Sequence, residues 1–186
     1  MDQELKEYLM GIILKENKKE YVCHLQYVVE IGMRLANAYP SVDPLVIEVA
    51  CLLHDIGRDK ELPGEVHAQT GHRLGGEILK NTQLSEDQKK NILSCILLHN
   101  SDDIPETIEQ QIVRTADAGS KVEYHEAFML MCKKPTYNER LAWGIKYLEK
   151  GYKKICIDSY QVQIQKKYEM IHSIYEKTLT MIDYVN

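Results

Sequence analysis

The sequence lacks the features that mark secreted and membrane proteins. No run of apolar residues is long enough to cross a bilayer. The first residues read Met-Asp-Gln-Glu, which is acidic where a secretory signal would be basic. We therefore expect a cytoplasmic protein with no membrane partner.

Cysteine pairs with the spacing of a zinc or redox motif are also absent. The five cysteines are odd in number, and no two of them form a CxxC motif. Several stand within apolar runs, as in Ala50-Cys51-Leu52-Leu53. The sequence therefore predicts buried free thiols in a reducing compartment, and not disulfides or zinc ligands, for Cys23, Cys51, Cys95, Cys132 and Cys156.

Positive charge is not concentrated anywhere along the 186 residues. The formal net charge is −5, and the 44% hydrophobic and 27% charged residues are ordinary for a soluble globular protein. Because no basic face stands out, a nucleic-acid polymer is not an expected partner. We interpret the scattered lysine doublets as solvated helix surface: Lys18-Lys19, Lys89-Lys90, Lys133-Lys134, Lys153-Lys154 and Lys166-Lys167.

Strand-like alternation of polar and apolar residues is largely missing, and apolar residues recur at helical spacing instead. Asp43 and Pro44 begin a segment that is apolar almost all round, which places it in the middle of the core. No linker, repeat or low-complexity segment divides the chain. We predict an all-α, single-domain protein, residues 1–186, with helices at 20–38, 44–56, 68–81, 85–100, 106–120, 137–150 and 159–183.

A histidine and an aspartate, His54-Asp55, stand at the end of this apolar helix. Alone they could be a helix-terminal histidine and a loop aspartate. His24 and Asp117 interrupt apolar stretches of two other predicted helices, where each alone would be a satisfied core residue. A buried carboxylate is costly unless it is paired or bound to a metal, and helices around one core can bring such residues together. The four together predict a site for iron, manganese, cobalt, nickel or zinc.

Two further histidines could enlarge this site. His67 begins one predicted helix and His99 ends the next, each beside apolar residues. Ligands at helix ends can line one mouth of a bundle and leave coordination positions for water and substrate. His125 and His172, by contrast, have polar neighbours and are predicted to lie on the surface.

The order of these residues resembles the signature of a known family. His24, His54-Asp55 and Asp117 are similar to the H…HD…D signature of the HD superfamily of metal-dependent phosphohydrolases. That superfamily's HDIGK segment is similar to His54-Asp55-Ile56-Gly57-Arg58, with Arg in place of Lys.

The resemblance covers about residues 20–121 and implies an HD-domain helical bundle, on which the C-terminal helices, 122–186, are expected to pack. It implies a first divalent metal held by His24, His54, Asp55 and Asp117. By resemblance to the members with two metals, Asp55 of this chain is expected to bridge to a second ion held by His67 and His99. One or two transition-metal ions are therefore expected, with magnesium less favoured. It further implies that metal-activated water attacks phosphorus in a small phosphorylated substrate, a nucleotide or another phosphate ester.

Charged residues directly after the metal pair are candidates for catalysis beside Asp55 itself. If the helix continues by one turn, Arg58 and Asp59 project toward the metals. The planar guanidinium of Arg58 suits a phosphate oxygen, and Asp59 could shuttle a proton or orient water. Lys60 and Lys121 are further phosphate candidates. The alternative for the charged residues after Gly57 is a solvated loop.

Two other functions remain open beside the phosphohydrolase. A di-iron oxygenase would use the same histidines, since some proteins of this fold cleave carbon bonds with an iron pair. A non-catalytic nucleotide-sensing module would retain the fold, although the complete ligand set argues against it.

Tyrosines recur along the last predicted helix, at Tyr160, Tyr168, Tyr175 and Tyr184. Such a stripe is typical of core packing or of contact between subunits, which makes a homodimer one expectation. An aromatic shelf for a nucleobase is the alternative.

Overall fold

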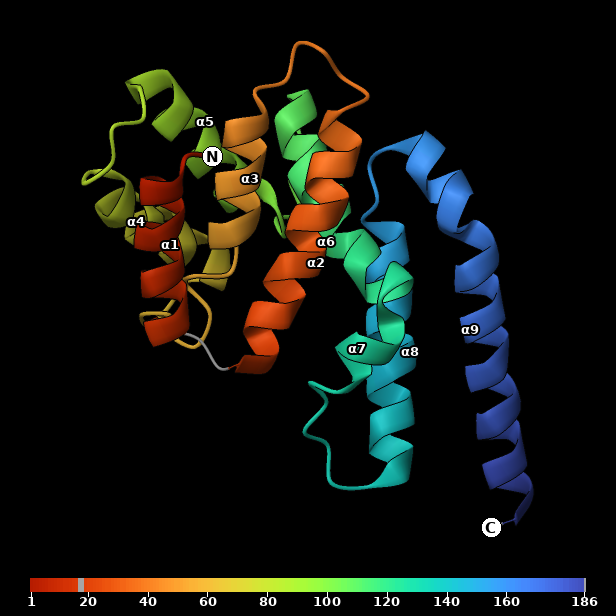
Figure 1. Ribbon diagram of the computed structural model, residues 1–186. Helices are drawn as coiled ribbons and strands as arrows, with labels where there is room; N and C mark the ends of the chain where they lie inside the picture. Colours follow the sequence, from red (N-terminus) through yellow and green to blue (C-terminus); the bar gives the residue numbers. More distant parts are fainter. Residues whose placement is uncertain (17–18, 186) are drawn as a thin grey trace.

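The computed structural model describes the backbone of residues 1–16 and 19–185 and the side chains of residues 1–15 and 21–181. Within the described backbone the chain is helical with no strand, so the prediction of an all-α fold is confirmed (Figure 1). The helices are α1 (Gln3–Glu16), α2 (Lys19–Ala36), α3 (Pro44–Leu53), α4 (His67–Leu79), α5 (Glu86–Leu98), α6 (Ile108–Glu123), α7 (His125–Met129), α8 (Tyr137–Lys153) and α9 (Asp158–Val185).

Helix α3 lies in the middle of the bundle, as its apolar sequence predicts. The Asp43 side chain accepts a hydrogen bond from Leu45 N at 2.9 Å, and Pro44 occupies the first turn. Seven of the ten residues of α3 are buried. It contacts α1, α2, α5 and α6, so that α1 stands on one side of it and α2 and α6 on the other (Figure 1).

The predicted helix 44–56 ends three residues early, at Leu53, with His54 as its C-cap. Residues 54–59 form turns, in which Arg58 N donates to Asp55 O at 3.0 Å. The expected extra helical turn through Arg58 and Asp59 is therefore wrong. Asp59 is exposed and has a φ of 62°, a left-handed conformation that a continuing helix excludes.

Helices α8 and α9 run side by side and pack on α6 (Figure 1). A Cβ on Gly119 would fall 2.4 Å from Tyr160 Cε1, so the Tyr160 ring lies directly against the α6 backbone. Tyr160 and Tyr175 are buried, and Tyr168 stacks on Tyr152 with ring centroids 3.9 Å apart. Core packing thus explains these tyrosines, while the side chain of Tyr184 lies outside the described residues.

Two helices were not predicted. In α1, Leu9 and Ile13 are fully buried and share one face at a spacing of four residues, which joins this helix to α2 and α3. The short α7 follows α6 after a single residue. No helix of the described chain combines the length and apolar character needed to cross a membrane.

The five cysteines are free, as expected, but their burial differs. Cys51 and Cys95 are buried in the core, Cys132 and Cys156 are half-buried, and Cys23 is exposed. The prediction of burial is wrong for Cys23 because it lies next to the buried His24 on α2, and a helix turns adjacent residues toward different sides.

Candidate metal centre

The six residues expected as metal ligands converge from five helices. His24 comes from α2 and Asp117 from α6. His54 and Asp55 end α3, His67 begins α4, and His99 caps the end of α5. Five of the six are buried, and the His67 side chain is 16% exposed. Residues separated by up to 93 positions in the sequence therefore meet at one end of α3.

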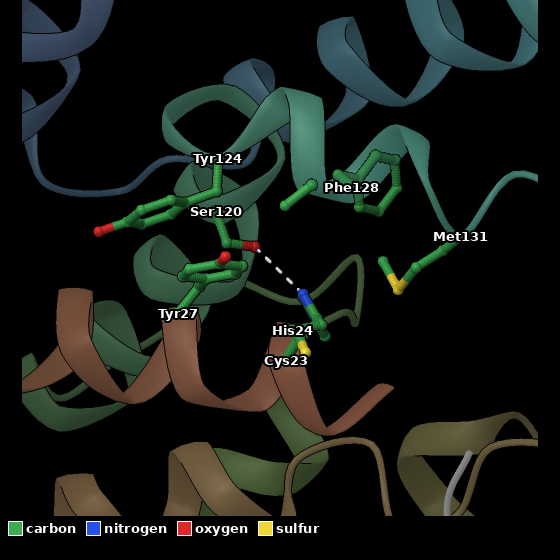
Figure 2. Close-up of a pocket in the computed structure, with 8 residues that line it drawn as sticks. Cys23, His24, Tyr27, Ser120, Tyr124, Phe128 and Met131 are labelled. Carbon is green, nitrogen blue, oxygen red and sulfur yellow. Dashed lines mark hydrogen bonds between the residues drawn. The ribbon is translucent and has the colours of Figure 1, made fainter. Parts of the chain in front are cut away.

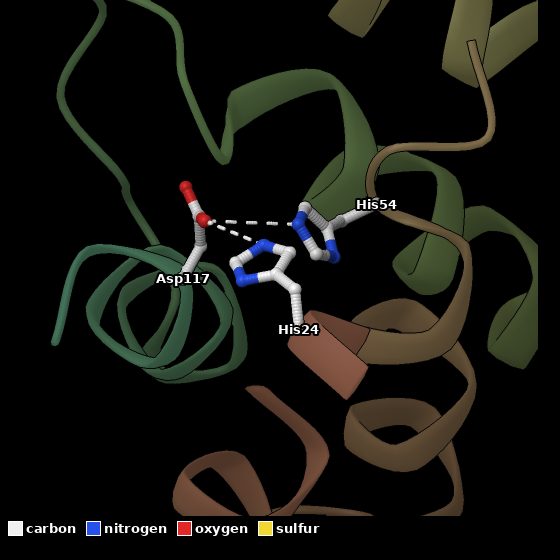
Figure 3. Close-up of side chains that lie close together, drawn as sticks. All are labelled: His24, His54 and Asp117. Atoms are coloured by element: carbon white, nitrogen blue, oxygen red, sulfur yellow. Dashed lines mark ion pairs between the residues drawn. The ribbon is translucent and has the colours of Figure 1, made fainter. Parts of the chain in front are cut away.

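A first group consists of His24, His54 and Asp117 (Figure 3). Asp117 Oδ1 lies 3.4 Å from His24 Nε2 and 3.7 Å from His54 Nε2. One ligand atom from each residue lies within 4.8 Å of the others, so the three could hold a metal ion.

A second group shares His54 with the first and adds Asp55 and His99. Asp55 Oδ2 lies 3.5 Å from His54 Nε2, and Asp55 Oδ1 lies 3.5 Å from His99 Nε2. His67 Nε2 is 3.6 Å from Asp55 Oδ1 and faces His99 Nε2 across 3.2 Å. The two oxygens of one carboxylate thus lie near different histidines, Oδ2 near His54 and Oδ1 near His67 and His99, which suits a bridging ligand.

Backbone carbonyls orient two of the imidazole rings. His54 Nδ1 lies 2.8 Å from Cys51 O, and His99 Nδ1 lies 2.6 Å from Ile96 O. A carbonyl only accepts, so each Nδ1–H donates and each Nε2 is directed into the site. His54 Nε2 is buried and has no hydrogen-bond partner among the described residues. A buried polar atom without a partner is costly, and a divalent metal bound to imidazole nitrogens and carboxylates would satisfy it.

Two cationic side chains form ion pairs with the carboxylates of the candidate metal site. Arg58 Nη2 donates to Asp55 Oδ1 at 2.9 Å and to Oδ2 at 2.8 Å, and Lys121 Nζ donates to Asp117 Oδ1 at 2.7 Å. Burial would raise the pKa of Asp55, but His54, His99 and Arg58 more than offset it and hold the pKa well below its usual range. Burial opposes ionisation of Asp117 in the same way, and Lys121 leads the groups that keep its pKa low. Both carboxylates are therefore anionic at neutral pH.

Burial keeps two of the histidines neutral. It lowers the pKa of His24 and lowers the pKa of His67 to about 4. For His54, burial also favours the neutral ring, but Asp55 and Asp117 outweigh it and raise the pKa. A metal ion at His54 Nε2 would therefore compete with a proton, and its binding would weaken as the pH falls.

A cavity of about 260 Å³ opens beside two of the candidate ligands, His67 and Asp117. Its lining combines residues near the metal site with one stripe of α8 and its C-cap, Lys154: Arg58, His67, Asn100, Asp117, Ala118, Lys121, Tyr147, Lys150, Gly151 and Lys154. Lys154 is half-buried and its Nζ donates to Asn100 Oδ1 at 2.6 Å. The interpretation of Lys153-Lys154 as solvated surface is therefore wrong for Lys154. The signal that could have found the stripe is the helical spacing of positions 147, 150, 151 and 154.

A second, much smaller cavity adjoins His24 on the side of α7 (Figure 2). Its volume is about 20 Å³, enough for one water molecule but not for a substrate. Tyr27 and Tyr124 stack in its wall with ring centroids 4.0 Å apart. Ser120 Oγ donates to Asp117 O at 2.7 Å and lies 3.5 Å from His24 Nδ1, so it fixes the ring from this side.

Two histidines outside the site differ from each other. The prediction that His125 lies on the surface is wrong, because it is 5% exposed. Its Nδ1–H donates to Lys121 O at 2.8 Å, and its Nε2 accepts from Tyr175 OH at 2.7 Å. His172 is half-buried and lies 3.0 Å from Glu149 Oε1. Neither histidine reaches the metal site.

These features define a class of protein, an all-helical bundle with a buried site of histidines and carboxylates that could hold a divalent metal ion. The family model described as HD domain matches residues 21–120. The chain belongs to the HD domain family, as the H…HD…D order indicates.

A solved structure supports the fold. The crystal structure of a predicted HD superfamily hydrolase from an uncultured Thermotogales bacterium has a TM-score of 0.61 to this chain. The match covers 95% of this chain and 92% of that one at 20% sequence identity. The likeness therefore extends over the C-terminal helices, which the family match does not include.

Two curated relatives are each called Ribonuclease Y. The protein from Borrelia garinii subsp. bavariensis is 34% identical over 95 residues, which are 51% of this chain and 18% of that protein. The protein from Thermoanaerobacter pseudethanolicus is 32% identical over 120 residues, which are 60% of this chain and 21% of that protein. The matched part is thus about a fifth of the length of these relatives.

Proposed function

We propose that this protein is a metal-dependent phosphohydrolase that acts on a nucleotide or another small phosphate ester. The observation that carries the proposal is that a buried cluster of candidate metal ligands adjoins a cationic cavity. His54 Nε2, which has no hydrogen-bond partner among the described residues, lies within that cluster, and four cationic side chains line the cavity beside it. Histidine and carboxylate ligands suit a hydrolytic metal centre, and the cations suit the charge of a phosphate group.

The ligand set favours a transition metal over magnesium, because imidazole nitrogens outnumber carboxylates. His24, His54 and Asp117 would hold one ion, with Asp55 beside them, and Asp55, His67 and His99 would hold a second. When bound, such an ion lowers the pKa of a water molecule toward about 7 and polarises a phosphoryl oxygen.

Two cationic side chains both bind the carboxylates of the candidate metal site and line the cavity that would take a phosphate. Arg58 holds the Asp55 carboxylate through both of its oxygens while it also lines the cavity. Lys121 does the same for Asp117. Each cation therefore positions a metal-site carboxylate and neutralises charge on the side where the substrate enters. Asp59 is not among the residues that line the cavity, so the proposed mechanism gives it no step.

The cationic cavity also bears on the alternatives. Four cations beside the histidines favour an anionic substrate, which phosphate-ester hydrolysis requires, and an oxygenase would need them only if its substrate were also anionic. The relatives called Ribonuclease Y make an RNA phosphodiester a second substrate class to test. Free cysteines, two of them buried, suit a reducing compartment such as the cytoplasm.

Metal content and turnover, measured together, test the proposal. The protein would be purified without chelator as wild type, as Asp55→Ala and as Asp87→Ala. Asp87 is exposed in the first turn of α5, at the opposite end of that helix from His99, and is the matched control. We expect at least one ion per chain in wild type and in Asp87→Ala, and loss of metal in Asp55→Ala.

Phosphate release would be followed with nucleoside mono-, di- and triphosphates, sugar phosphates and a short oligoribonucleotide, and oxygen uptake would be recorded in parallel. Hydrolysis of a small substrate that requires Asp55 supports the proposal. Equal metal content in all three proteins would exclude the metal site. Oxygen uptake that requires iron would indicate an oxygenase, cleavage of the oligoribonucleotide alone a nuclease, and metal without turnover a sensing module.

A further inference from the structure

We propose that helix α8 builds a second anion subsite beside the metal centre, which takes the distal phosphoryl group of a substrate with two or more adjacent phosphoryl groups. The inference rests on the proposed function only for the phosphoryl group at the metals. The subsite itself consists of Lys150 and Lys154, with Asn100 between Lys154 and the metal ligands.

The first argument is the balance of charge in the cavity. Of its four cations, Arg58 and Lys121 are matched by Asp55 and Asp117. Among the described side chains, no carboxylate lies within ion-pair distance of Lys150 or Lys154. Two positive charges therefore remain beside the metal site of a chain whose net charge is −5. Such a local excess in a concave site attracts anions.

The second argument is the way α8 approaches the site. A Cβ on Gly151 would fall 2.8 Å from Ala118 O, so α8 touches the α6 backbone one residue after Asp117. Side chains three and four residues from Gly151 or from one another share that face of the helix. Lys150 and Lys154 are four residues apart, and both line the cavity.

The third argument is a chain of contacts from the subsite to the metal ligands. Lys154 Nζ donates to Asn100 O at 2.9 Å and to Asn100 Oδ1 at 2.6 Å. The Nδ2 of the same amide lies 3.3 Å from His67 Nε2. One amide group thus links the Lys154 ammonium to a candidate metal ligand, so an anion held at Lys154 would lie next to a phosphoryl group held at the metals.

The cost of holding these lysines together supports the same conclusion. Burial and then the charge of Lys150 lower the pKa of Lys154. An anion bound beside the Lys154 ammonium would offset both effects and stabilise its charged form. Both lysines lie beyond residue 120, where the family match ends, so this chain's C-terminal part supplies the charge of the subsite.

Calorimetric titration of chelator-treated protein at low salt tests the subsite without any metal or turnover. The ligands are pyrophosphate and orthophosphate. The variants are Lys150→Gln, Lys150→Gln/Lys154→Gln, and the control Lys146→Gln/Lys153→Gln, which removes the same charge from positions of the same helix that are not among the cavity-lining residues. Lys150→Gln alone avoids any loss of the Lys154–Asn100 bonds, and thermal unfolding checks that each variant is folded.

We expect wild type to bind pyrophosphate more tightly than orthophosphate. Lys150→Gln should weaken pyrophosphate binding about tenfold and the double variant further, because a charge-assisted hydrogen bond is lost each time. The control should stay within about twofold of wild type on the same scale. No binding by wild type, equal affinity for the two anions, or equal weakening in both double variants would overturn the proposal.

The two proposals can fail separately. If pyrophosphate binding depends on Lys150 while no phosphate compound is hydrolysed, the subsite stands and the phosphohydrolase does not. If phosphate monoesters are hydrolysed while pyrophosphate binding is insensitive to these lysines, the opposite holds. Comparison of pyrophosphate with ADP in the same titrations distinguishes an inorganic from a nucleoside ligand.

Discussion

Gly57 and Gly71 are in backbone contact. A Cβ on Gly57 would fall 2.3 Å from Gly71 N and 2.4 Å from His67 O, and a Cβ on Gly71 would lie 3.4 Å from His54 O. The turn that follows the histidine–aspartate pair therefore packs directly on the first turns of α4. This contact sets the position of His67 relative to Asp55.

Replacement of Gly57 by alanine should destabilise both the fold and the metal site. Because the new methyl group meets backbone atoms that cannot rotate away, we expect Gly57→Ala to lower the free energy of unfolding by about 1–3 kcal/mol. Metal content should fall in parallel as His67 is displaced. Urea unfolding followed by circular dichroism measures the first effect, and elemental analysis the second.

The matched control is Gly11→Ala, in the interior of α1, where a Cβ meets nothing within 4 Å. It should raise the free energy of unfolding by about 0.5–1 kcal/mol, because alanine favours the helix. A Gly57→Ala protein as stable as wild type would contradict the close contact.

Arg58 should act on metal affinity as well as on substrate. It holds both oxygens of Asp55, so Arg58→Ala frees a carboxylate that the metal site needs in one orientation. We expect metal affinity to fall about 10–100-fold, as it does when other groups that orient metal ligands are removed. Competition with a metallochromic chelator measures this. Arg73→Ala, which breaks the exposed pair with Glu65, should leave affinity unchanged.

Arg58→Lys separates the two roles. A lysine retains the charge but not the planar fork, so it should restore part of the substrate affinity and little of the metal affinity. Unchanged metal affinity in Arg58→Ala would leave Arg58 as a phosphate contact only.

His125 should make the stability of the metal-free protein depend on pH. Burial lowers the pKa of His125 in the folded protein, while in the unfolded chain the pKa is about 6.5. Below that value the unfolded chain binds a proton that the folded protein does not, so the free energy of unfolding decreases as the pH decreases. The stability that the neutral ring contributes is present above about pH 6.5 and is lost as the pH falls through the folded-state pKa.

His125→Phe removes this titration and both hydrogen bonds of the ring. At pH 7.5 it should lower the free energy of unfolding by about 1–3 kcal/mol, since Lys121 O and the Tyr175 hydroxyl lose their partner. The difference from wild type should narrow as the pH is lowered toward 5. Urea titrations at several pH values would measure it, and a difference independent of pH would show that the histidine does not titrate.

Tyr147 should report whether the substrate carries a base. Its ring lines the cavity and packs on Trp143, with ring centroids 4.7 Å apart, and Phe128 lies behind. Such a supported ring can stack on a nucleobase, which contributes about 1–3 kcal/mol. We expect Tyr147→Ala to raise KM about tenfold for a nucleotide but not for pyrophosphate, and Tyr147→Phe to resemble wild type. Equal effects on both substrates would assign Tyr147 to packing.

The convergence of the candidate metal ligands could be predicted because most of them break or end an apolar pattern that is visible locally. His54 and Asp55 end the most apolar helix of the chain, and Asp117 stands within another. The end of α3 could not be placed from the same signal, because its position depends on the contact of Gly57 with a helix that begins ten residues later.

The missed features depend on partners far away in the sequence. His125 has polar neighbours, yet its buried partner Tyr175 is 50 residues away. Lys154 looks like half of a solvated doublet until Asn100, 54 residues earlier, is seen to accept its hydrogen bonds. In α1, by contrast, the spacing of Leu9 and Ile13 was a sufficient local signal for a helix.

The close contact of Gly151 with α6 marks the boundary between the candidate metal ligands and the cavity-lining residues of α8. The residues that would hold a metal ion belong to the segment that the family model matches, whereas the stripe that lines the cavity belongs to α8 and its C-cap, which approach α6 closely at Gly151. Substitutions at positions 147 and 150 should therefore affect the candidate metal ligands less than substitutions at 154, where Lys154 holds the Asn100 amide that contacts His67. A library confined to positions 147 and 150 would sample new substrates beside a constant metal site, and natural divergence is free to do the same.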